Sequence, residues 1–345
     1  MSARPLLILA TVAVVLGAIL VLSNRPTQRT NVADSLFAPS LAERLDDVQT
    51  VRIVGAGNAT VASLTRTDND WIVEERDGYR ANTDTIRSAL TLLSRATVIE
   101  AKTSNPAEFE RLGVESLSNS AAGGIGIEFL PDSLGLPGIV LGEPTGTSYR
   151  YARLADSDQS WLINADPEVP EETTQWLDAE ILSIDGSRIE RILIEHADGE
   201  ILDIFKTAPD QSNYTVADIP EGRTLQYPGV ANVIGNVLRG LRLEDVAAAG
   251  DVAGTPEITT TFETFDGLVV TARGYDVEGN GWLEFSAQID TQFSNPDEAV
   301  SSEAQELNER LSGWRYRIPD YQYNQIARRM DDLLSAEETA EESTN

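Results

Sequence analysis

Short runs in which apolar and polar residues alternate cover most of the chain, and this period of two predicts β-strands. In the first half we expect strands over residues 48–54, 61–66, 71–73, 124–130, 138–141, 148–154 and 160–163. In the second half we expect them over residues 188–195, 200–206, 214–216, 257–264, 268–275 and 282–289. The pairs Asp198-Gly199 and Asp266-Gly267 separate two such runs and are typical of tight hairpin turns.

Helical periodicity is rarer and falls between the strands. A helix that begins at Asn82 or Thr83 is predicted by an apolar stripe at Ile86, Ala89, Leu90 and Leu93. A second stripe comprises Val230, Val233, Ile234, Val237, Leu238 and Leu241. Pro106 can open a short helix that Gly113 ends, and a closing helix is expected over residues 171–182. Residues 295–311 predict an amphipathic helix through Val300, Ala304, Leu307 and Leu311.

The second half of the chain reads as a diverged copy of the first. Four segments return in order: 48–53 as 189–194, the stripe 86–95 as 230–239, 161–163 as 314–316, and 176–182 as 329–335. The offset grows from about 141 to about 153 residues, so the repeated unit is a whole domain. The helix at 295–311 has no counterpart in the first copy.

These patterns predict an α+β protein with an N-terminal transmembrane helix followed by two homologous domains of mainly antiparallel sheet plus helix. The expected parts are an anchor at residues 1–22, a linker at 23–44, repeat domains at 45–185 and 186–335, and an acidic disordered tail at 336–345. Both domains lie within the usual size range.

The N-terminal sequence predicts that the protein is inserted in a membrane. Residues 6–22 form an apolar run in which Thr11 is the one polar residue. As a helix this run spans about 26 Å, close to the roughly 30 Å of a bilayer core. A cleaved signal peptide is the alternative, but no small-residue cleavage site of the A-x-A type follows. We expect residues 6–22 to stay inserted and the long C-terminal part to be translocated.

Composition narrows the function further. The formal net charge of −30 would repel a phosphate backbone, so we expect no nucleic-acid partner. The chain has no cysteine, which excludes disulfides and thiolate chemistry. Its two lysines are Lys102 and Lys206.

The motifs that could carry chemistry are weak. His196 is the one histidine, and its place beside the turn at Asp198 favours a structural or solvent-exposed role over catalysis. Residues 276–281 (DVEGNG) resemble the start of a calcium loop, yet position 287 is alanine where a bidentate Glu is needed. The glycine-rich segments 142–148 and 123–126 lack the lysine and the following helix of a phosphate loop. We therefore predict no catalytic, cofactor-binding or metal-binding residue, and no cofactor.

The aromatic residues allow two interpretations. Most of a set of ten recur at related places in the two halves, which favours packing in the cores, although several on one exposed face would form a sugar- or peptide-binding strip. The ten are Trp71, Tyr79, Tyr149, Tyr151, Trp161, Trp176, Tyr214, Trp282, Trp314 and Tyr316. Abundant Asp and Glu also leave open a hydrolase that uses carboxylates alone, which would need a carboxylate with a raised pKa.

Several segments together resemble a bacterial family known as domain of unknown function 4340. They are AKTSNPAEFERLGVES (101–116), TSYRYARLADSDQSWLIN (147–164), WLDAEIL (176–182) and GWRYRIPDYQYNQIARRMDDLL (313–334). The resemblance covers roughly residues 45–334. It brings no assigned catalytic residue, and it implies a membrane-tethered protein of the bacterial inner membrane whose gene lies near ABC-transporter components of the gliding-motility type.

Together these features predict a non-enzymatic, single-pass inner-membrane protein with periplasmic C-terminal domains. Its expected role is a scaffold or accessory subunit of a cell-envelope complex, with envelope membrane proteins such as ABC-transporter subunits as partners. One alternative is a periplasmic binding module for a sugar, peptide or cell-wall fragment. The other alternative is the carboxylate-based hydrolase.

Overall fold

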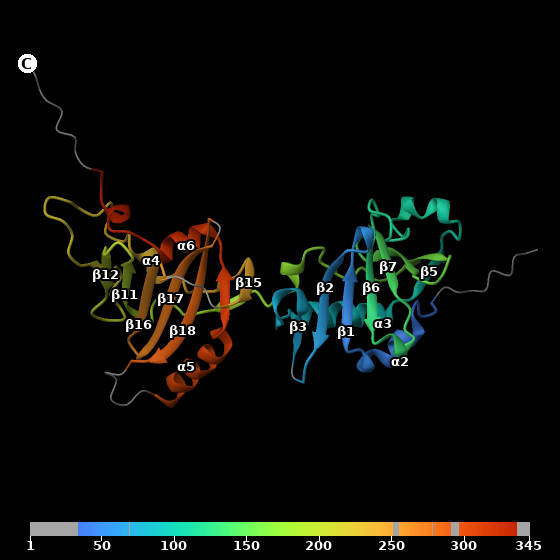
Figure 1. The fold of residues 1–345 in the computed structure, drawn as a ribbon, viewed down its shortest axis with the longest axis horizontal. Coiled ribbons are helices and arrows are strands. Elements are labelled where there is room, and N and C mark those ends of the chain that lie inside the picture. The colour runs from blue at the N-terminus through green and yellow to red at the C-terminus, as the bar shows by residue number, and fades with distance from the viewer. Residues whose placement is uncertain (1–33, 69, 251–254, 278, 291–296, 337–345) are drawn as a thin grey trace, which may run out of the picture. The chain divides into compact units, whose positions relative to one another are not determined.

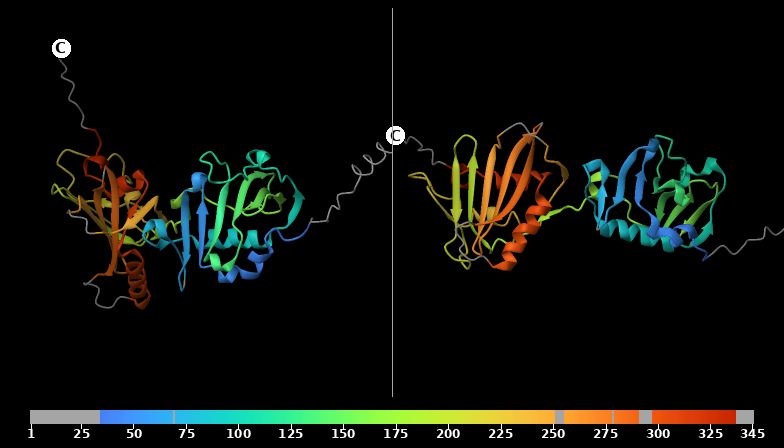
Figure 2. Two further views of the ribbon diagram at one scale, coloured as in Figure 1. Left: turned by 45° about the vertical axis from the view of Figure 1, so that its right-hand side comes forward. Right: turned by 60° about the horizontal axis from the view of Figure 1, so that its bottom comes forward.

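The computed structural model describes residues 34–68, 70–250, 255–277, 279–290 and 297–336. In these ranges the chain is a mixed α+β protein with two large antiparallel sheets and a small two-stranded one (Figure 1; Figure 2). No helix in this described part is long and apolar enough to cross a membrane. The predicted anchor at residues 6–22 and the predicted tail from residue 337 onward lie outside the described residues.

The first large sheet has nine strands in the order β4-β3-β2-β1-β6-β7-β8-β9-β5. Their bounds are β1 Thr50–Val54, β2 Thr60–Arg66, β3 Trp71–Val73, β4 Tyr79–Arg80, β5 Val98–Ala101, β6 Ile125–Leu130, β7 Ile139–Thr145, β8 Tyr149–Leu154 and β9 Ser160–Ile163. The α-helices that precede or connect them are α2 Pro39–Arg44 and α3 Thr83–Arg95. The short 3-10 helices are η1 Leu45–Asp47, η2 Ala56–Asn58, η3 Glu74–Arg76, η4 Pro106–Glu108, η5 Glu110–Leu112, η6 Asp132–Leu134 and η7 Thr173–Trp176.

The second large sheet has eight strands in the order β13-β12-β11-β16-β17-β18-β19-β15. Their bounds are β11 Ile189–His196, β12 Ile201–Phe205, β13 Thr215–Val216, β15 Asp245–Ala248, β16 Ile258–Thr264, β17 Leu268–Val277, β18 Asn280–Ile289 and β19 Trp314–Arg317. The helices of this part are α4 Asn232–Gly235, α5 Glu298–Leu311, α6 Asp320–Ile326 and η8 Asp331–Leu333. The small sheet pairs β10 Glu180–Leu182 with β14 Leu241–Arg242.

The two strand orders match position by position once β4 is set aside. The matching extends to single hydrogen bonds. Arg66 N–H donates to Gln49 C=O at 2.8 Å in the first sheet, and Lys206 N–H donates to Glu190 C=O at 2.7 Å in the second. The two edge-strand pairs match as well, because Ala101 lies opposite Trp161 as Ala248 lies opposite Trp314.

The chain divides into two compact units. One comprises Met1–Val48, Val54–Ala59 and Ser88–Val169, and the other comprises Gln49–Ile53, Thr60–Arg87 and Pro170–Asn345. The boundary runs through the nine-stranded sheet, so the units do not coincide with the sheets.

Helix α3 supplies the apolar core beside the first sheet, as its sequence predicts. Ile86, Ala89, Leu90 and Leu93 are buried, while Leu92 on the same helix is 42% exposed. Helix α5 likewise buries Val300, Ala304, Leu307 and Leu311, and it packs against β17 and β18. Both amphipathic stripes are therefore confirmed.

Three local predictions are wrong. Residues 171–182 do not form one helix, because η7 ends at Trp176 and the chain continues into β10. The second apolar stripe forms only the four-residue helix α4, and Val233 is 44% exposed. A side chain at Gly235 would meet the Tyr214 ring at 2.4 Å, so the chain needs glycine, a poor helix former, in this helix.

The third error concerns the alignment of the closing segments. Asn82 N–H donates to Trp176 C=O, and Gln226 N–H donates to Leu333 C=O in the same way. Trp176 therefore corresponds to Leu333 by hydrogen bonding, four residues beyond the Arg329 that the sequence repeat suggests. Part of the predicted linker is also packed, since Phe37 and Leu41 are buried.

Candidate functional site

A groove in the first unit is the most site-like hollow on the segments that carry the family resemblance. It has a volume of about 460 Å³ and is lined by Lys102, Thr103, Glu108, Arg111, Leu112 and Tyr151. Five of these residues belong to the segment 101–116, and Tyr151 lies on β8. The structure thus brings the segments 101–116 and 147–164 together at one place.

Local sequence explains how the first segment turns over the sheet. The Asn105 side chain accepts a hydrogen bond from Ala107 N–H at 3.2 Å and so caps η4, with Pro106 in its first turn. η5 ends at Gly113, whose φ of +66° is a left-handed conformation that glycine adopts without strain. The predicted short helix between Pro106 and Gly113 is therefore confirmed as two 3-10 turns.

Glycines in the sheet allow this segment to lie directly on the backbone. A Cβ on Gly142 would stand 2.0 Å from Leu112 O, and a Cβ on Gly124 would stand 2.1 Å from Gly113 O. Such separations are impossible, so only glycine fits at both positions. The two glycine-rich segments that we compared with phosphate loops thus have a packing role.

The buried side chain of Arg153 on β8 holds the segment 101–116 in place. Arg153 Nε donates to Val114 O at 2.8 Å, and its Nη1 donates to Ala155 O and Ser157 O at 3.0 Å each. The guanidinium also lies 5.1 Å from the Phe109 ring centroid. Burial lowers the pKa of Arg153. Phe109 and Val114 pack with Val140 in an apolar cluster, and two residues that line the groove, Leu112 and Tyr151, pack against it.

The groove presents two cations in a strongly acidic chain. Lys102 Nζ lies 2.8 Å from Glu100 Oε2 and 5.7 Å from the Tyr151 ring centroid. Arg111 Nη1 lies 2.9 Å from Glu108 Oε2, and the Arg111 side chain is 80% exposed. The lining offers hydrogen-bond donors and an aromatic face, which suit a polar ligand. It holds no histidine or cysteine that could serve as a base or a nucleophile.

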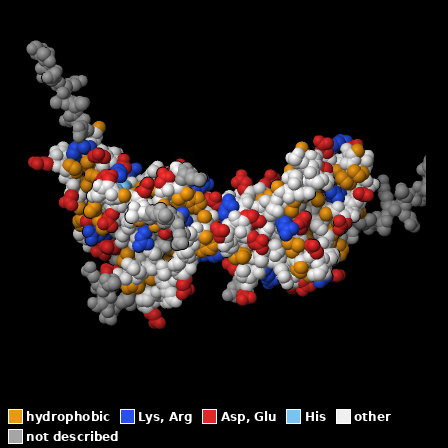
Figure 3. Space-filling model, in the orientation of Figure 1, with side chains coloured by type: hydrophobic (Ala, Val, Ile, Leu, Met, Phe, Trp, Pro, Cys, Tyr) orange, Lys and Arg blue, Asp and Glu red, His pale blue; other side chains and the backbone are white. Residues whose placement is uncertain are grey.

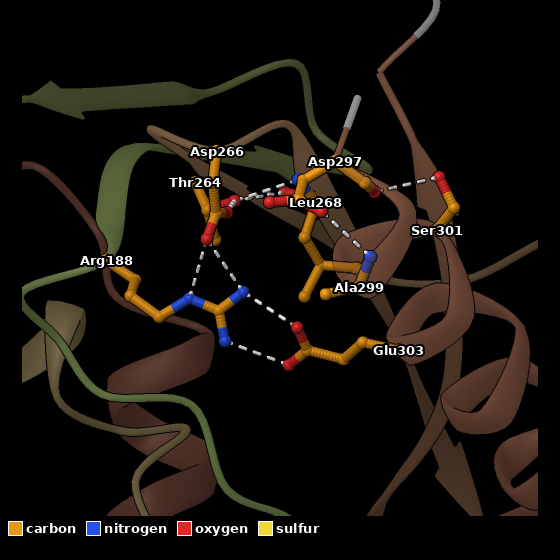
Figure 4. A network of polar contacts seen from close by, with 8 residues as sticks. All are labelled: Arg188, Thr264, Asp266, Leu268, Asp297, Ala299, Ser301 and Glu303. Carbon is orange, nitrogen blue, oxygen red and sulfur yellow. Dashed lines mark hydrogen bonds and ion pairs between the residues drawn. The ribbon is translucent and has the colours of Figure 1, made fainter. Parts of the chain in front are cut away.

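A second polar cluster, the α5 clamp, holds helix α5 to the eight-stranded sheet (Figure 4). It comprises Arg188, Asp266 and Glu303. Arg188 donates through Nη1 and Nη2 to both Glu303 carboxylate oxygens at 2.9 and 2.8 Å, and through Nε to Asp266 Oδ2 at 3.0 Å. These two carboxylates raise the pKa of Arg188.

The carboxylates of the clamp are fixed by the elements that carry them. Thr264 Oγ1 donates to Asp266 Oδ1 and accepts from Leu268 N–H at 2.8 Å, which shapes the turn between β16 and β17. Asp297 caps α5 by accepting from Ala299 N–H at 3.1 Å. The α5 clamp is therefore a structural brace, because every charged group in it is committed to a partner.

His196 is also part of the structure. It is the last residue of β11 and only 8% exposed, with Nε2 3.2 Å from Arg328 O. Arg329 Nη2 lies 2.9 Å from Asp198 Oδ2, and Arg329 also pairs with Glu200 across the same hairpin. The burial of His196 supports the structural role over the solvent-exposed one.

The structure also shows where the calcium-loop-like segment and the acidic residues lie. Residues 276–281 form the turn between β17 and β18, where Gly279 N–H donates to Asp276 Oδ1 at 2.7 Å. Among the described residues, no group of three or more His, Asp or Glu could hold a metal ion. None of the Asp and Glu side chains in the described ranges is fully buried. Figure 3 shows acidic side chains scattered over the visible surface.

The aromatic residues divide between core and surface. Trp176, Tyr79, Tyr214 and Tyr316 are buried, and Tyr149 is 42% exposed. Trp71, Trp161, Trp282 and Trp314 are half-buried. Core packing therefore accounts for only part of the set.

The fold and the site together define an α+β protein with two large antiparallel sheets and a small one. The chain belongs to the family described as Domain of unknown function (DUF4340), whose family model matches residues 71–257, more than half of the chain. This range is narrower than residues 45–334, over which the resemblance was expected. It begins at β3 and ends just before β16, so it includes parts of both large sheets. Searches of curated proteins and of solved structures returned no match.

Proposed function

We propose that this protein is a membrane-anchored, extracytoplasmic scaffold or accessory subunit of a cell-envelope complex. Residues 6–22 would anchor it in the bacterial inner membrane, and the domains at 45–185 and 186–335 would lie in the periplasm. Its partners would be envelope membrane proteins, among which ABC-transporter subunits fit the family association. In this proposal the protein is not an enzyme.

The matching strand order of the two large sheets is the observation that carries the proposal. Two sheets of one topology, joined by a repeated sequence pattern, support an internal duplication. A duplicated domain offers two related surfaces for protein contacts, and this suits a scaffold. The arginine-carboxylate pairs at Arg188, Arg191 and Arg329 serve structure, which adds support for a role outside catalysis.

Co-purification tests this function. The tagged full-length chain would be expressed at its native level and extracted in a mild detergent. We expect a stoichiometric membrane partner, and a matched preparation that lacks residues 6–22 should lose it. Recovery of the full-length chain alone would contradict the scaffold.

The groove at Lys102 favours a second candidate function, a binding module for a sugar, peptide or cell-wall fragment. Lys102 and Tyr151 provide a cation beside an aromatic face, and Thr103 adds a hydroxyl group. A ligand with a carboxylate could pair with Lys102 and Arg111.

Calorimetry with soluble muropeptides or their disaccharides would test this second function. Lys102→Met should abolish binding, whereas Lys206→Met should preserve it. Equal behaviour of the two variants would remove the groove as a ligand site.

A further inference from the structure

The outer edge of the eight-stranded sheet lacks a strand that the nine-stranded sheet has. In the nine-stranded sheet, β4 pairs antiparallel with β3. The carbonyl groups of Trp71 and Val73 accept hydrogen bonds there from the N–H groups of Ala81 and Gly78, at 2.8 and 3.1 Å. In the eight-stranded sheet, β13 is itself the outermost strand.

Backbone register identifies the groups of β13 that face away from β12, on Val216, whose side chain is buried. Val216 lies opposite Ile204 as Val73 lies opposite Leu64. Ala217 N–H donates to Asp203 C=O at 2.9 Å, so Ala217 faces β12. In an antiparallel strand the neighbouring residue turns its N–H and C=O the other way. Val216 therefore presents both groups at the outer edge, where no strand of the described chain pairs with them.

The chain after β13 leaves the edge instead of turning back along it. Asp218 and Gly222 both have positive φ, at 49° and 83°, and Pro220 lies between them. The segment returns only at Leu225, which pairs with Leu334 instead of β13.

A groove of about 750 Å³ lies between this segment and the start of β13. Its lining includes Ser212, Thr215, Ile219, Arg223, Leu225 and Pro228. The described residues that line it include no carboxylate, although the chain has 56 acidic residues. Thr215 is exposed, whereas Tyr214 beside it is buried, so the groove has a firm inner wall.

We propose that this groove binds an extended segment of a partner protein, which adds as a strand to β13 in the place that β4 holds in the other sheet. This inference deepens the proposed function and rests on it for the identity of the partner. Main-chain hydrogen bonds to Val216 supply affinity, and Ile219, Leu225 and Pro228 select small aliphatic side chains. The rest of the described lining is polar and free of carboxylates, and its one cation, Arg223, lies 3.7 Å from Asp331, so the groove suits a segment with few positive charges.

The first experiment tests the edge with a probe taken from the protein itself. The sequence of residues 76–82, which contains β4, is appended after Asn345 of the full-length chain. Ser335 N–H donates to Thr224 C=O at 2.8 Å, so residues 336–345 start beside the groove and serve as the linker. The tether gives an effective concentration on the order of mM.

Amide hydrogen exchange at Val216 is the readout. We expect exchange to slow at least tenfold in the appended chain, and not when the appended copy carries proline at its Ala81 position, because the Ala81 N–H is a donor to the neighbouring strand in the nine-stranded sheet. Unchanged exchange at Val216 would overturn the proposal. Slow exchange in the unmodified chain that is lost on deletion of residues 337–345 would also overturn it, because the chain's own tail would then be the occupant.

The second experiment tests whether the partner binds at the groove. Because the chain has no cysteine, Ser212→Cys and Ser312→Cys each create a unique site for a bulky maleimide at an exposed position. We expect the label at 212 to reduce partner recovery at least tenfold, and the label at 312 to leave it unchanged. Equal recovery with both labels would overturn the groove proposal while the scaffold stands. If the unlabelled chain recovers no partner, the scaffold fails and the exchange experiment alone decides whether the edge accepts a strand.

Discussion

The two large sheets share one strand order but carry different additions. In the nine-stranded sheet, residues 102–124 connect β5 to β6 and cover the sheet with η4 and η5. In the eight-stranded sheet, the connection from β15 to β16 is short, and helix α5 lies between β18 and β19 instead. The strands form a common frame, and the additions are what distinguish one sheet from the other.

Corresponding hairpins of the two sheets are also braced in different ways. The turn between β1 and β2 is held by the first addition, because Gly57 N–H donates to Asn119 C=O at 3.0 Å. The equivalent turn between β11 and β12 is held by Arg329, which pairs with Asp198 and Glu200. The strand frame that the two sheets share is therefore held by segments that differ between them.

Truncating one buried side chain in the core of each sheet is expected to have the largest effect on stability. Ile234→Ala and Leu90→Ala should each lower the free energy of unfolding by about 2–5 kcal/mol, because both side chains are buried, at 0% and 7% exposure. Hydrogen exchange should increase mainly in the eight-stranded sheet for the first variant and in the nine-stranded sheet for the second. Val233→Ala and Leu92→Ala are matched controls at 44% and 42% exposure. Losses in the controls as large as in the core variants would break the correspondence.

Replacing Gly124 tests how residues 102–124, the addition of the nine-stranded sheet, are held in place. Gly124→Ala should cost about 1–3 kcal/mol of unfolding free energy and lift residues 102–116, because its Cβ would collide with Gly113 O. Gly123→Ala is the control, since the nearest atom to a Cβ there is 4.0 Å away. Chemical denaturation with hydrogen exchange measures both effects. If the two alanine variants are equally stable, close backbone contact does not hold this segment.

Breaking the α5 clamp tests the second addition. Arg188→Ala should cost about 1 kcal/mol, because a half-exposed charged pair is worth little more. Exchange should accelerate in α5 and remain slow in β11 and β12. Arg239→Ala is a useful control, since Arg239 pairs with Asp185 at 3.9 Å and is 70% exposed. Uniform acceleration throughout the sheet would show that the clamp supports more than the helix.

The smallest expected effect is a pH dependence confined to the eight-stranded sheet. Burial raises the pKa of Glu263, and nearby Arg191 lowers it less. A carboxyl with a raised pKa favours the folded state below its ordinary pKa of 4.5, and this contribution is lost as pH rises through the raised value. Glu263→Gln should therefore increase stability by a few tenths of a kcal/mol at pH 7 and change nothing near pH 3. Thermal unfolding of the variant and the native chain at both pH values measures this difference in stability. A Glu263→Gln variant that is less stable than the native chain at pH 7 would contradict the prediction.

Alternation of apolar and polar residues was sufficient to predict most of the frame. β9 matches its predicted range, and β2, β16 and β18 differ from theirs by at most a few residues. The strands that lie outside the predicted strand ranges are β4, β5, β10, β14, β15 and β19, which have two to four residues each. Such short strands form because a neighbour supplies hydrogen bonds, and no periodicity can register over so few positions.

The same limit explains the helix that was wrongly predicted at residues 171–182. Leu177 and Ile181 are both buried, and their i, i+4 spacing also fits one face of a helix. The pairing of Glu180 with Arg242 and of Leu182 with Leu241 gave this segment a strand conformation instead. Here a tertiary contact overrode the local pattern.

The groove at Lys102 could not be predicted, because Tyr151 reaches it from another strand. The glycine runs did contain a signal for it. Isolated glycines in strands mark places where another backbone comes close, and Gly124 and Gly142 do so. We compared them with phosphate loops and rejected that role, without considering a packing role.

The close contacts at Gly124 and Gly142 provide a way to classify relatives by sequence alone. A family member that retains the segment between β5 and β6 in the same place has to keep glycine at both positions, since no other side chain fits. A member that replaces both glycines has shortened or relocated that segment and with it the groove. The residues at these two positions therefore separate relatives that share this groove from relatives that share only the strand frame.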